Sequence, residues 1–120
     1  MATGVLIGMM TAPDQASAAK IVDALVQEQL IACGNITSGV QSIYRWQGAI
    51  ERADEILVIL KTTEQLAAQV VARIRDLHPY EVPEVLFFPV TIGYDSYMRW
   101  VHESVVSTQD TRDGAKKPQS

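Results

Sequence analysis

The sequence Val40-Gln-Ser-Ile-Tyr-Arg-Trp46 is followed by Gln47-Gly48-Ala49 and then by Glu55-Ile-Leu-Val-Ile-Leu-Lys61. Aromatic and β-branched residues favour strands, and a glycine between two such runs favours a tight turn. The two runs therefore predict a long hairpin in the middle of the chain. The second run is almost continuously apolar, which indicates a strand that is buried on both faces.

The segments on either side of the hairpin alternate between strands and helices. Val5 to Thr11 is a short apolar run that predicts a buried strand, and an amphipathic helix of about four turns follows it, ending near Leu30. After the hairpin, Thr62-Thr-Glu-Gln65 is typical of a capping box before a second helix. Val85 to Ile92 predicts another strand, with Pro89 at an edge or bulge, and Tyr94 to Val106 predicts a short helix. The apolar faces of the two main helices are Ala18, Ile21, Val22, Leu25 and Val26 in the first, and Leu66, Val70, Ile74 and Leu77 in the second.

This order predicts a βαββαβ arrangement, the ferredoxin-like α+β fold. We expect an antiparallel sheet with both main helices on one face, an extended β-hairpin and a short C-terminal helix. The strands are apolar on both sides, so the second face of the sheet needs a cover, and another copy of the chain would supply it. Residues 1–107 are expected to form one domain, and residues 108–120 a flexible polar tail.

Composition narrows the class of protein. The chain has 120 residues, of which 48% are hydrophobic, and a net charge of −4. This size suits one domain, and the acidic balance argues against a nucleic-acid or membrane partner. The apolar runs are too short to span a bilayer, and no basic residue precedes Lys20, so we expect no secretory signal. The single cysteine, Cys33, is compatible with a reducing compartment, and we expect a cytoplasmic location.

The usual signatures of catalysis are missing from the sequence. There is no dinucleotide-binding glycine motif, no phosphate-binding loop of the Walker type and no Gly-x-Ser-x-Gly motif. Cys33 could pair with His78 or His102 as a nucleophile and its base, but one cysteine and two histidines coincide often by chance. We therefore expect no enzymatic activity and no organic cofactor.

Metal binding is the more specific chemical possibility. Cys33 is either a small buried apolar residue or a thiolate ligand for Cu(I) or Zn(II). His78 is either a cation at a helix C-terminus or an imidazole ligand. These residues are far apart in sequence, so the ligands of a weak copper or other divalent site would have to converge from distant segments or chains. Carboxylates such as Glu55 or Glu84 would complete it.

The segment His78-Pro-Tyr-Glu-Val-Pro-Glu84 concentrates functional side chains on a rigid loop. Two prolines restrict its backbone, while Tyr80, Glu81 and Glu84 supply polar groups. Such a loop can form the wall of a pocket. Four aromatic residues elsewhere suit a subunit interface or a ligand cleft, namely Tyr44, Trp46, Tyr97 and Trp100.

Five segments together resemble the CutA divalent-cation tolerance proteins, in order from about Val5 to Val105. They are Thr11-Ala-Pro-Asp14, Leu30-Ile-Ala-Cys-Gly-Asn-Ile36, Ser42-Ile-Tyr-Arg-Trp-Gln-Gly48, Leu60-Lys-Thr-Thr63 and His78-Pro-Tyr-Glu-Val-Pro-Glu84. The His-Pro-Tyr-Glu-Val-Pro-Glu string and the Tyr-x-Trp-x-Gly hairpin are the most specific of these motifs.

The resemblance implies a homotrimer in which hairpins extend the sheets across subunits. It also implies tolerance of copper and other divalent metals, a cytoplasmic location in bacteria, and an architecture like the PII signalling trimers. Cys33 and His78 match positions suggested to bind metal in that family. Five further residues match positions that line its inter-subunit cleft, namely Trp46, Glu55, Lys61, Tyr80 and Tyr97.

Three functions are therefore in competition. The first is a metal-binding trimer for cation tolerance, with no reaction catalysed. The second is a PII-like regulator that binds a small anionic ligand or nucleotide in the inter-subunit cleft, which Arg45 and Lys61 would favour. The third, a small enzyme, has the least support. Glu55, Glu81 and Glu84 would instead favour a cation in the cleft.

Overall fold

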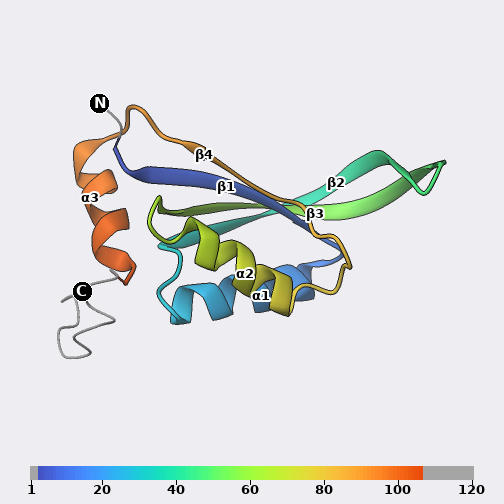
Figure 1. The fold of residues 1–120 in the computed structure, drawn as a ribbon, viewed down its shortest axis with the longest axis horizontal. Coiled ribbons are helices and arrows are strands. Elements are labelled where there is room, and N and C mark those ends of the chain that lie inside the picture. Colours follow the sequence, from blue (N-terminus) through green and yellow to red (C-terminus); the bar gives the residue numbers. More distant parts are fainter. Residues whose placement is uncertain (1–2, 107–120) are drawn as a thin grey trace.

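In the part of the chain that the structure describes, four strands form one antiparallel sheet, and three helices pack around it (Figure 1). This computed structural model describes residues 3–106. The elements in chain order are β1 (Val5–Ala12), α1 (Gln15–Gln27), β2 (Cys33–Trp46), β3 (Ala49–Thr63), α2 (Ala67–Leu77), β4 (Val85–Pro89) and α3 (Asp95–Ser104). The predicted order of elements, including the short C-terminal helix, is confirmed.

The strands lie in the order β2-β3-β1-β4, and every neighbouring pair is antiparallel. This is the expected ferredoxin-like topology, with β1 and β3 at the centre. β4 is an edge strand that ends at Pro89, which pairs with Leu6. Proline has no backbone N–H to donate, so an edge is the position where a sheet tolerates it.

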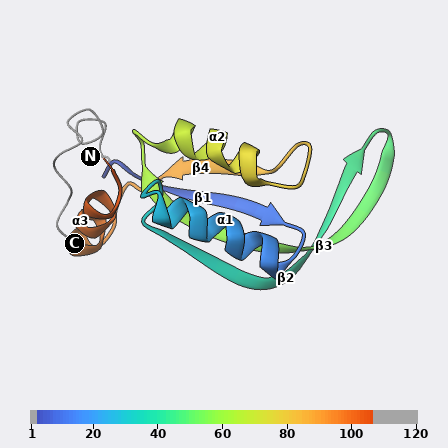
Figure 2. The ribbon, with the colours of Figure 1, turned by 90° about the horizontal axis from the view of Figure 1, so that it is seen from below.

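β2 and β3 form a hairpin that extends well beyond the rest of the molecule (Figure 2). Trp46 pairs with Ala49, so the turn consists of Gln47 and Gly48, with φ values of 51° and 85°. Two successive residues with positive φ match the right-handed twist of the strands, and glycine adopts the second at little cost. The hairpin explains why the molecule measures 49 Å along its longest axis but 29 and 24 Å along the others.

The hydrophobic core lies between the sheet and the two main helices, which cover the same face (Figure 1). Ile56, Val58 and Leu60 alternate along β3 and are buried against these helices. The helices contribute the buried residues Ala18, Ile21 and Leu25 from α1, and Val70 and Ile74 from α2. The predicted apolar faces are largely confirmed, although Val26 is 40% exposed. α1 ends at Gln27, slightly before the expected position, and Gln29 follows with a φ of 61°.

The predicted capping box at Thr62 to Gln65 is wrong. Thr62 and Thr63 are the last residues of β3 and pair with Leu6 and Val5 of β1. The Thr62 hydroxyl donates to the Leu30 carbonyl oxygen at 2.7 Å, and α2 begins later, at Ala67, without a side-chain cap. Pairing with the central strand therefore takes precedence over the local capping preference of the threonines.

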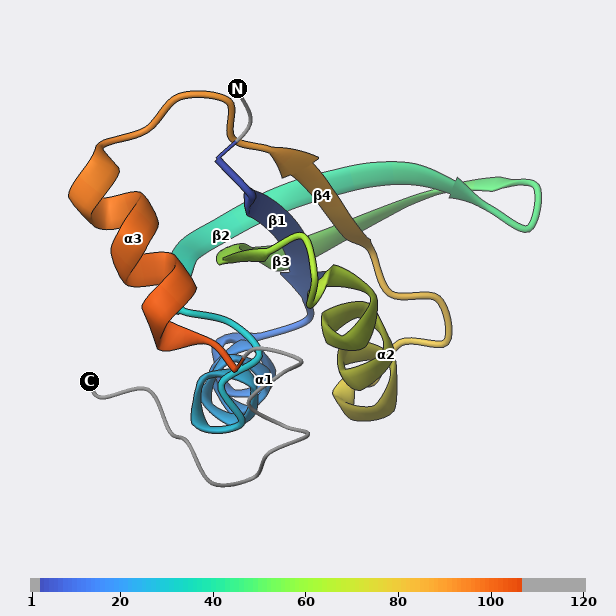
Figure 3. The ribbon, with the colours of Figure 1, turned by 60° about the vertical axis from the view of Figure 1, so that its left-hand side comes forward.

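The opposite face of the sheet carries apolar side chains that the main helices do not cover. Met9 lies between its partners Ile59 and Leu86, and Ile7 lies beside Phe88. Leu86 and Phe88 are 54% and 45% exposed. α3 packs at one end of the sheet, through the buried Val101, and leaves most of this face open (Figure 3). We call the surface formed by Ile7, Met9, Leu57, Ile59, Leu86 and Phe88 the open face.

The polar tail expected at residues 108–120 lies outside the described residues, as does residue 107. Within residues 3–106, no helix is both long enough and apolar enough to cross a membrane.

Gly8 is a point of close contact that can be tested. A Cβ atom at Gly8 would lie 2.4 Å from the ring of Phe87, its partner on β4. Gly8→Ala should therefore lower the free energy of unfolding by about 1–3 kcal/mol, the usual cost of overpacking a core. Gly39→Ala is the control, because its Cβ would meet no atom closer than 3.6 Å, and its effect should stay within about 0.5 kcal/mol. Denaturant unfolding at a fixed protein concentration measures both variants, and equal effects would contradict the close contact.

Candidate functional site

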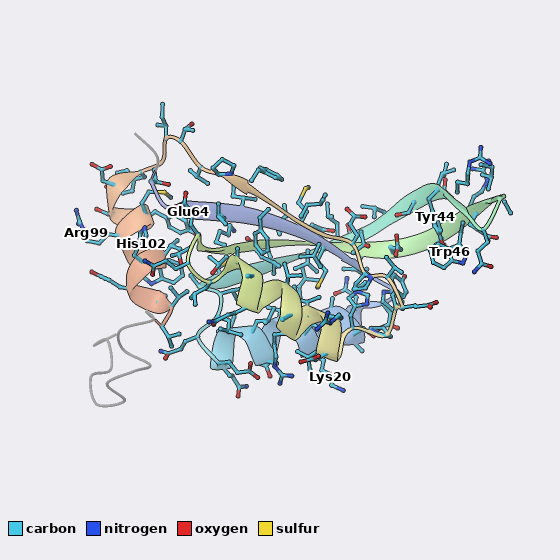
Figure 4. All side chains as sticks on the ribbon, in the orientation of Figure 1. Lys20, Tyr44, Trp46, Glu64, Arg99 and His102 are labelled. Carbon is cyan, nitrogen blue, oxygen red and sulfur yellow. The ribbon has the colours of Figure 1, made fainter. Side chains whose placement is uncertain are left out.

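A cavity of about 300 Å³ lies where the hairpin leaves the body of the protein. It is lined by Thr11 at the end of β1, Tyr44 and Trp46 of β2, Glu55 of β3, and Tyr80, Glu81, Val82 and Glu84 of the loop that joins α2 to β4. Figure 4 shows Tyr44 and Trp46 on the hairpin, at the opposite end of the molecule from Glu64 and His102. We call this cavity the acidic pocket, because its lining contains three carboxylates and neither lysine nor arginine.

Glu55 and Tyr80 form a side-chain hydrogen bond within the acidic pocket. Glu55 is only 7% exposed, and its Oε2 accepts a hydrogen bond of 2.7 Å from the Tyr80 hydroxyl. Burial, and then this hydrogen bond to Glu55, raise the pKa of Tyr80 well above its usual value. The phenol therefore stays protonated and donates. No other hydrogen bond from the described residues reaches the carboxylate of Glu55.

His78 lies behind the acidic pocket and is also buried, with 7% of its surface exposed. Its Nε2 donates to the Thr11 carbonyl oxygen at 2.7 Å, and its Nδ1 accepts from the Tyr80 backbone N–H at 3.1 Å. A carbonyl can only accept, so the ring is assigned as the neutral tautomer with its proton on Nε2. Both ring nitrogens are thus engaged, and the observed role of His78 is to hold Tyr80 against the end of β1.

Cys33 lies at the other end of the sheet. It pairs with Lys61, which is six residues beyond Glu55 on β3, so the two sites are about 20 Å apart along the strand. The Lys61 ammonium group donates to the Cys33 Sγ at 3.8 Å and also contacts the Asn35 side chain. Burial, and then the neighbouring Cys33, raise the pKa of the Tyr97 hydroxyl. Cys33, Lys61 and Tyr97 therefore form a separate cluster near α3.

The structure thus divides the residues that the sequence suggested for one metal site and one cleft. Glu55, Glu84, Tyr80 and Trp46 surround the acidic pocket, His78 supports it from behind, and Cys33, Lys61 and Tyr97 lie at the far end of the sheet. Within the described part of the chain, no three side chains of His, Cys, Asp or Glu are placed to hold a metal ion together.

Four lining residues are not among the site residues predicted from the sequence, namely Thr11, Tyr44, Glu81 and Val82. Glu81 and Val82 belong to the loop that the sequence predicts as a pocket wall. Thr11 is the last residue of a predicted strand, and only the tertiary structure reveals its place in the pocket. For Tyr44, the sequence predicts a place at a subunit interface or ligand cleft, and its spacing of two from Trp46 places both residues on one face of the strand.

The acidic pocket has the chemistry of a cation site. Carboxylate oxygens are the donors that hard divalent cations prefer, and Cu(II) binds such donors as well. The lining residues supply carboxylate oxygens of the kind that divalent cations bind, although no three of them are placed to hold one ion together, and the only thiol of the chain is not among them.

Comparison with known proteins gives a consistent assignment. A sequence model described as the CutA1 divalent ion tolerance protein matches residues 6–104. The divalent-cation tolerance protein CutA of Thermus thermophilus is 41% identical over 96 residues, which cover 80% of this chain and 93% of that protein.

Solved structures show the same similarity at the level of the fold. The crystal structure of CutA from Xylella fastidiosa matches with a TM-score of 0.84 and 37% identity, covering 86% of this chain and 99% of that one. CutA1 from Oryza sativa matches with a TM-score of 0.84 and 30% identity, covering 87% and 95%. The protein described here therefore belongs to the CutA1 divalent ion tolerance family.

Proposed function

We propose that this protein contributes to divalent-cation tolerance as a homotrimer that binds cations at the acidic pocket of each subunit, without catalysing a reaction. The observation that carries the proposal is the buried carboxylate of Glu55 in a cavity that Glu81 and Glu84 also line. The name of the family and of its relatives supports the link to divalent cations.

A buried carboxylate needs compensation for its lost hydration. Among residues 3–106, Glu55 is the only carboxylate that is buried, and the one ion pair found there joins Arg73 to Glu28. The Tyr80 hydroxyl compensates Glu55 only in part, because it is a neutral donor. A cation in the acidic pocket would supply the missing charge, and Glu81 and Glu84 would add negative charge from the lining of the same cavity.

The donor set points to weak binding of a divalent ion. Oxygen ligands alone do not select one divalent metal, so the affinities follow the general order for divalent ions, in which Cu(II) binds most tightly. His78 would have to break an existing hydrogen bond before it could serve as a ligand. Cys33 remains a possible soft ligand for Cu(I) in a second location, where the Lys61 ammonium group would oppose an incoming cation.

The proposed trimer rests on the open face. Apolar patches of this kind are covered in soluble proteins, and copies of the same chain are the usual cover. The hairpin adds exposed apolar residues at Ile43 and Ile50, far from the body of its own subunit. The same arrangement would bring hairpin residues of one subunit close to another.

The acidic pocket does not favour a PII-like regulator that binds an anion. Lys61 and Arg45 suggested such a ligand. Lys61 lies at the other end of the sheet of the same subunit, and Arg45 lies between Tyr44 and Trp46 on β2 but is not a lining residue. Among the described lining residues, only acidic groups supply charge. The proposal includes a cytoplasmic location, for which the free thiol of Cys33 is the supporting observation.

The oligomeric state can be tested by introducing one charged side chain on the open face. Met9→Lys should dissociate the trimer, because Met9 lies in the middle of the open face and an unpaired lysine there could not be buried. Val71→Lys, on the exposed side of α2, should leave the trimer intact. Native mass spectrometry at micromolar concentration should give three times 13.2 kDa for the parent and the control. A parent protein of 13.2 kDa would contradict the proposal.

Cation binding can be tested with matched amide variants. Glu84→Gln should weaken the binding of Cu(II) and Zn(II) by about tenfold, because it removes one charged oxygen ligand. Glu64→Gln is the control, since Glu64 lies at the opposite end of the molecule (Figure 4). Calorimetry on metal-free protein measures both. If Cys33→Ser abolishes binding while Glu84→Gln does not, the acidic pocket is not the metal site.

A further inference from the structure

Aromatic side chains make up an unexpected share of the acidic pocket. Tyr44, Trp46 and Tyr80 are three of its eight lining residues. Divalent metal ions bind through oxygen, nitrogen or sulfur atoms and gain nothing from an apolar ring. The size of the cavity is also informative, because about 300 Å³ is the lower end of the range for organic ligands and far more than a single ion needs.

We propose that the acidic pocket binds a small organic ammonium ion that carries methyl groups, such as a quaternary ammonium compound. Its charge would lie near Glu55 and Glu84, and its methyl groups would contact the faces of Tyr44 and Trp46. Cations of this type are recognised by aromatic rings combined with carboxylates. The inference uses the same carboxylates as the proposed metal site, but it goes beyond the proposed function and does not depend on metal binding.

The charge of the pocket selects a cation over an anion or a neutral ligand. Within one subunit, the described lining residues include Glu55, Glu81 and Glu84 and no basic residue. Glu55 is more than nine-tenths buried, yet only Oε2 has a hydrogen-bond donor among the described residues. Its other oxygen has no hydrogen-bond donor among the described residues but is not enclosed, so an incoming positive charge would find a free acceptor there.

The aromatic residues select a weakly hydrated cation over a strongly hydrated one. Tyr44 and Trp46 stand at i and i+2 on β2, which places both on one side of the strand, and they are 43% and 42% exposed. A methylated ammonium loses little hydration when it leaves water for an aromatic surface. A primary ammonium or a metal aqua ion loses more, and rings cannot replace those hydrogen bonds.

The position of Tyr80 is set before any ligand arrives. Its hydroxyl is held by Glu55, its backbone N–H is held by His78, and its ring packs 4.8 Å from the imidazole, centroid to centroid. Pro79 and Pro83 further restrict the loop that carries it. A wall that is already ordered loses little entropy on binding, which favours a measurable affinity for a small ligand.

The test uses choline, tetramethylammonium and 3,3-dimethylbutanol, the last being a neutral analogue with the shape of choline. Each is titrated into the full-length protein by calorimetry. Choline and tetramethylammonium should bind, and dimethylbutanol should not. Trp46→Leu should weaken choline binding about tenfold, as expected for the loss of one cation–π contact. Trp46→Phe keeps an aromatic ring and should retain most of the affinity.

Trp100→Leu is the matched control, because Trp100 is similarly exposed but lies on α3, outside the acidic pocket. Native mass spectrometry verifies that each variant keeps the oligomeric state of the parent. The inference is overturned if dimethylbutanol binds as well as choline, or if Trp46→Leu and Trp100→Leu have equal effects. It is also overturned if choline does not bind at all, as when a neighbouring subunit fills the pocket.

Parallel titrations with Zn(II) separate this inference from the proposed function. Trp46→Leu should weaken choline binding by a larger factor than Zn(II) binding, because Trp46 has no oxygen ligand to lose, while Glu84→Gln should weaken the binding of both ligands. Binding of choline without Zn(II) would support the inference and contradict the proposed metal site. Binding of Zn(II) without choline would support the proposed metal site and contradict the inference.

Discussion

β3 pairs with β2 along most of its length, but with β1 only from Ile56 to Thr63. This difference in the length of pairing determines where the hairpin leaves the body of the protein. Where both partners are present, alternate residues of β3 are buried against α1 and α2. Where β1 ends, the hairpin continues alone and leaves the body of the protein. Glu55 precedes Ile56, the last residue of β3 that pairs with β1 on this side, and the acidic pocket forms around Glu55.

The loop between α2 and β4 closes the pocket because its polar groups find partners on the sheet. His78 bonds to the end of β1, and Tyr80 bonds both to His78 and to Glu55. Buried polar groups are costly unless they are satisfied, so these bonds determine where the loop can rest. Two prolines reduce the number of alternatives that the unfolded loop would explore. The result is a rigid wall that presents a tyrosine and two further carboxylates.

The acidic pocket and the cluster of Cys33, Lys61 and Tyr97 are separated along the sheet by the length of six strand residues, roughly 20 Å. Carboxylates and aromatic rings lie at the base of the hairpin. A thiol, an ammonium group and a phenol lie near α3. The acidic pocket is therefore lined by negative charge, whereas the cluster near α3 contains the positive charge of Lys61. Between them, the open face supplies the apolar surface that assembly of several chains would bury.

The sequence by itself determined the fold, because the signals for strands, helices and turns are local. Gly48 between two strand-forming runs indicated the hairpin, and Pro89 indicated an edge strand, as observed. The capping box predicted at Thr62 and Thr63 was wrong, because the pairing of these residues with β1 is a long-range contact that local sequence patterns do not contain. Only the tertiary structure decided that Glu55 and Glu84 share a pocket while Cys33 lies at the far end of the sheet. The physical reason is that distances between such residues depend on strand register and on where each strand ends, and register is settled by the packing of the whole core.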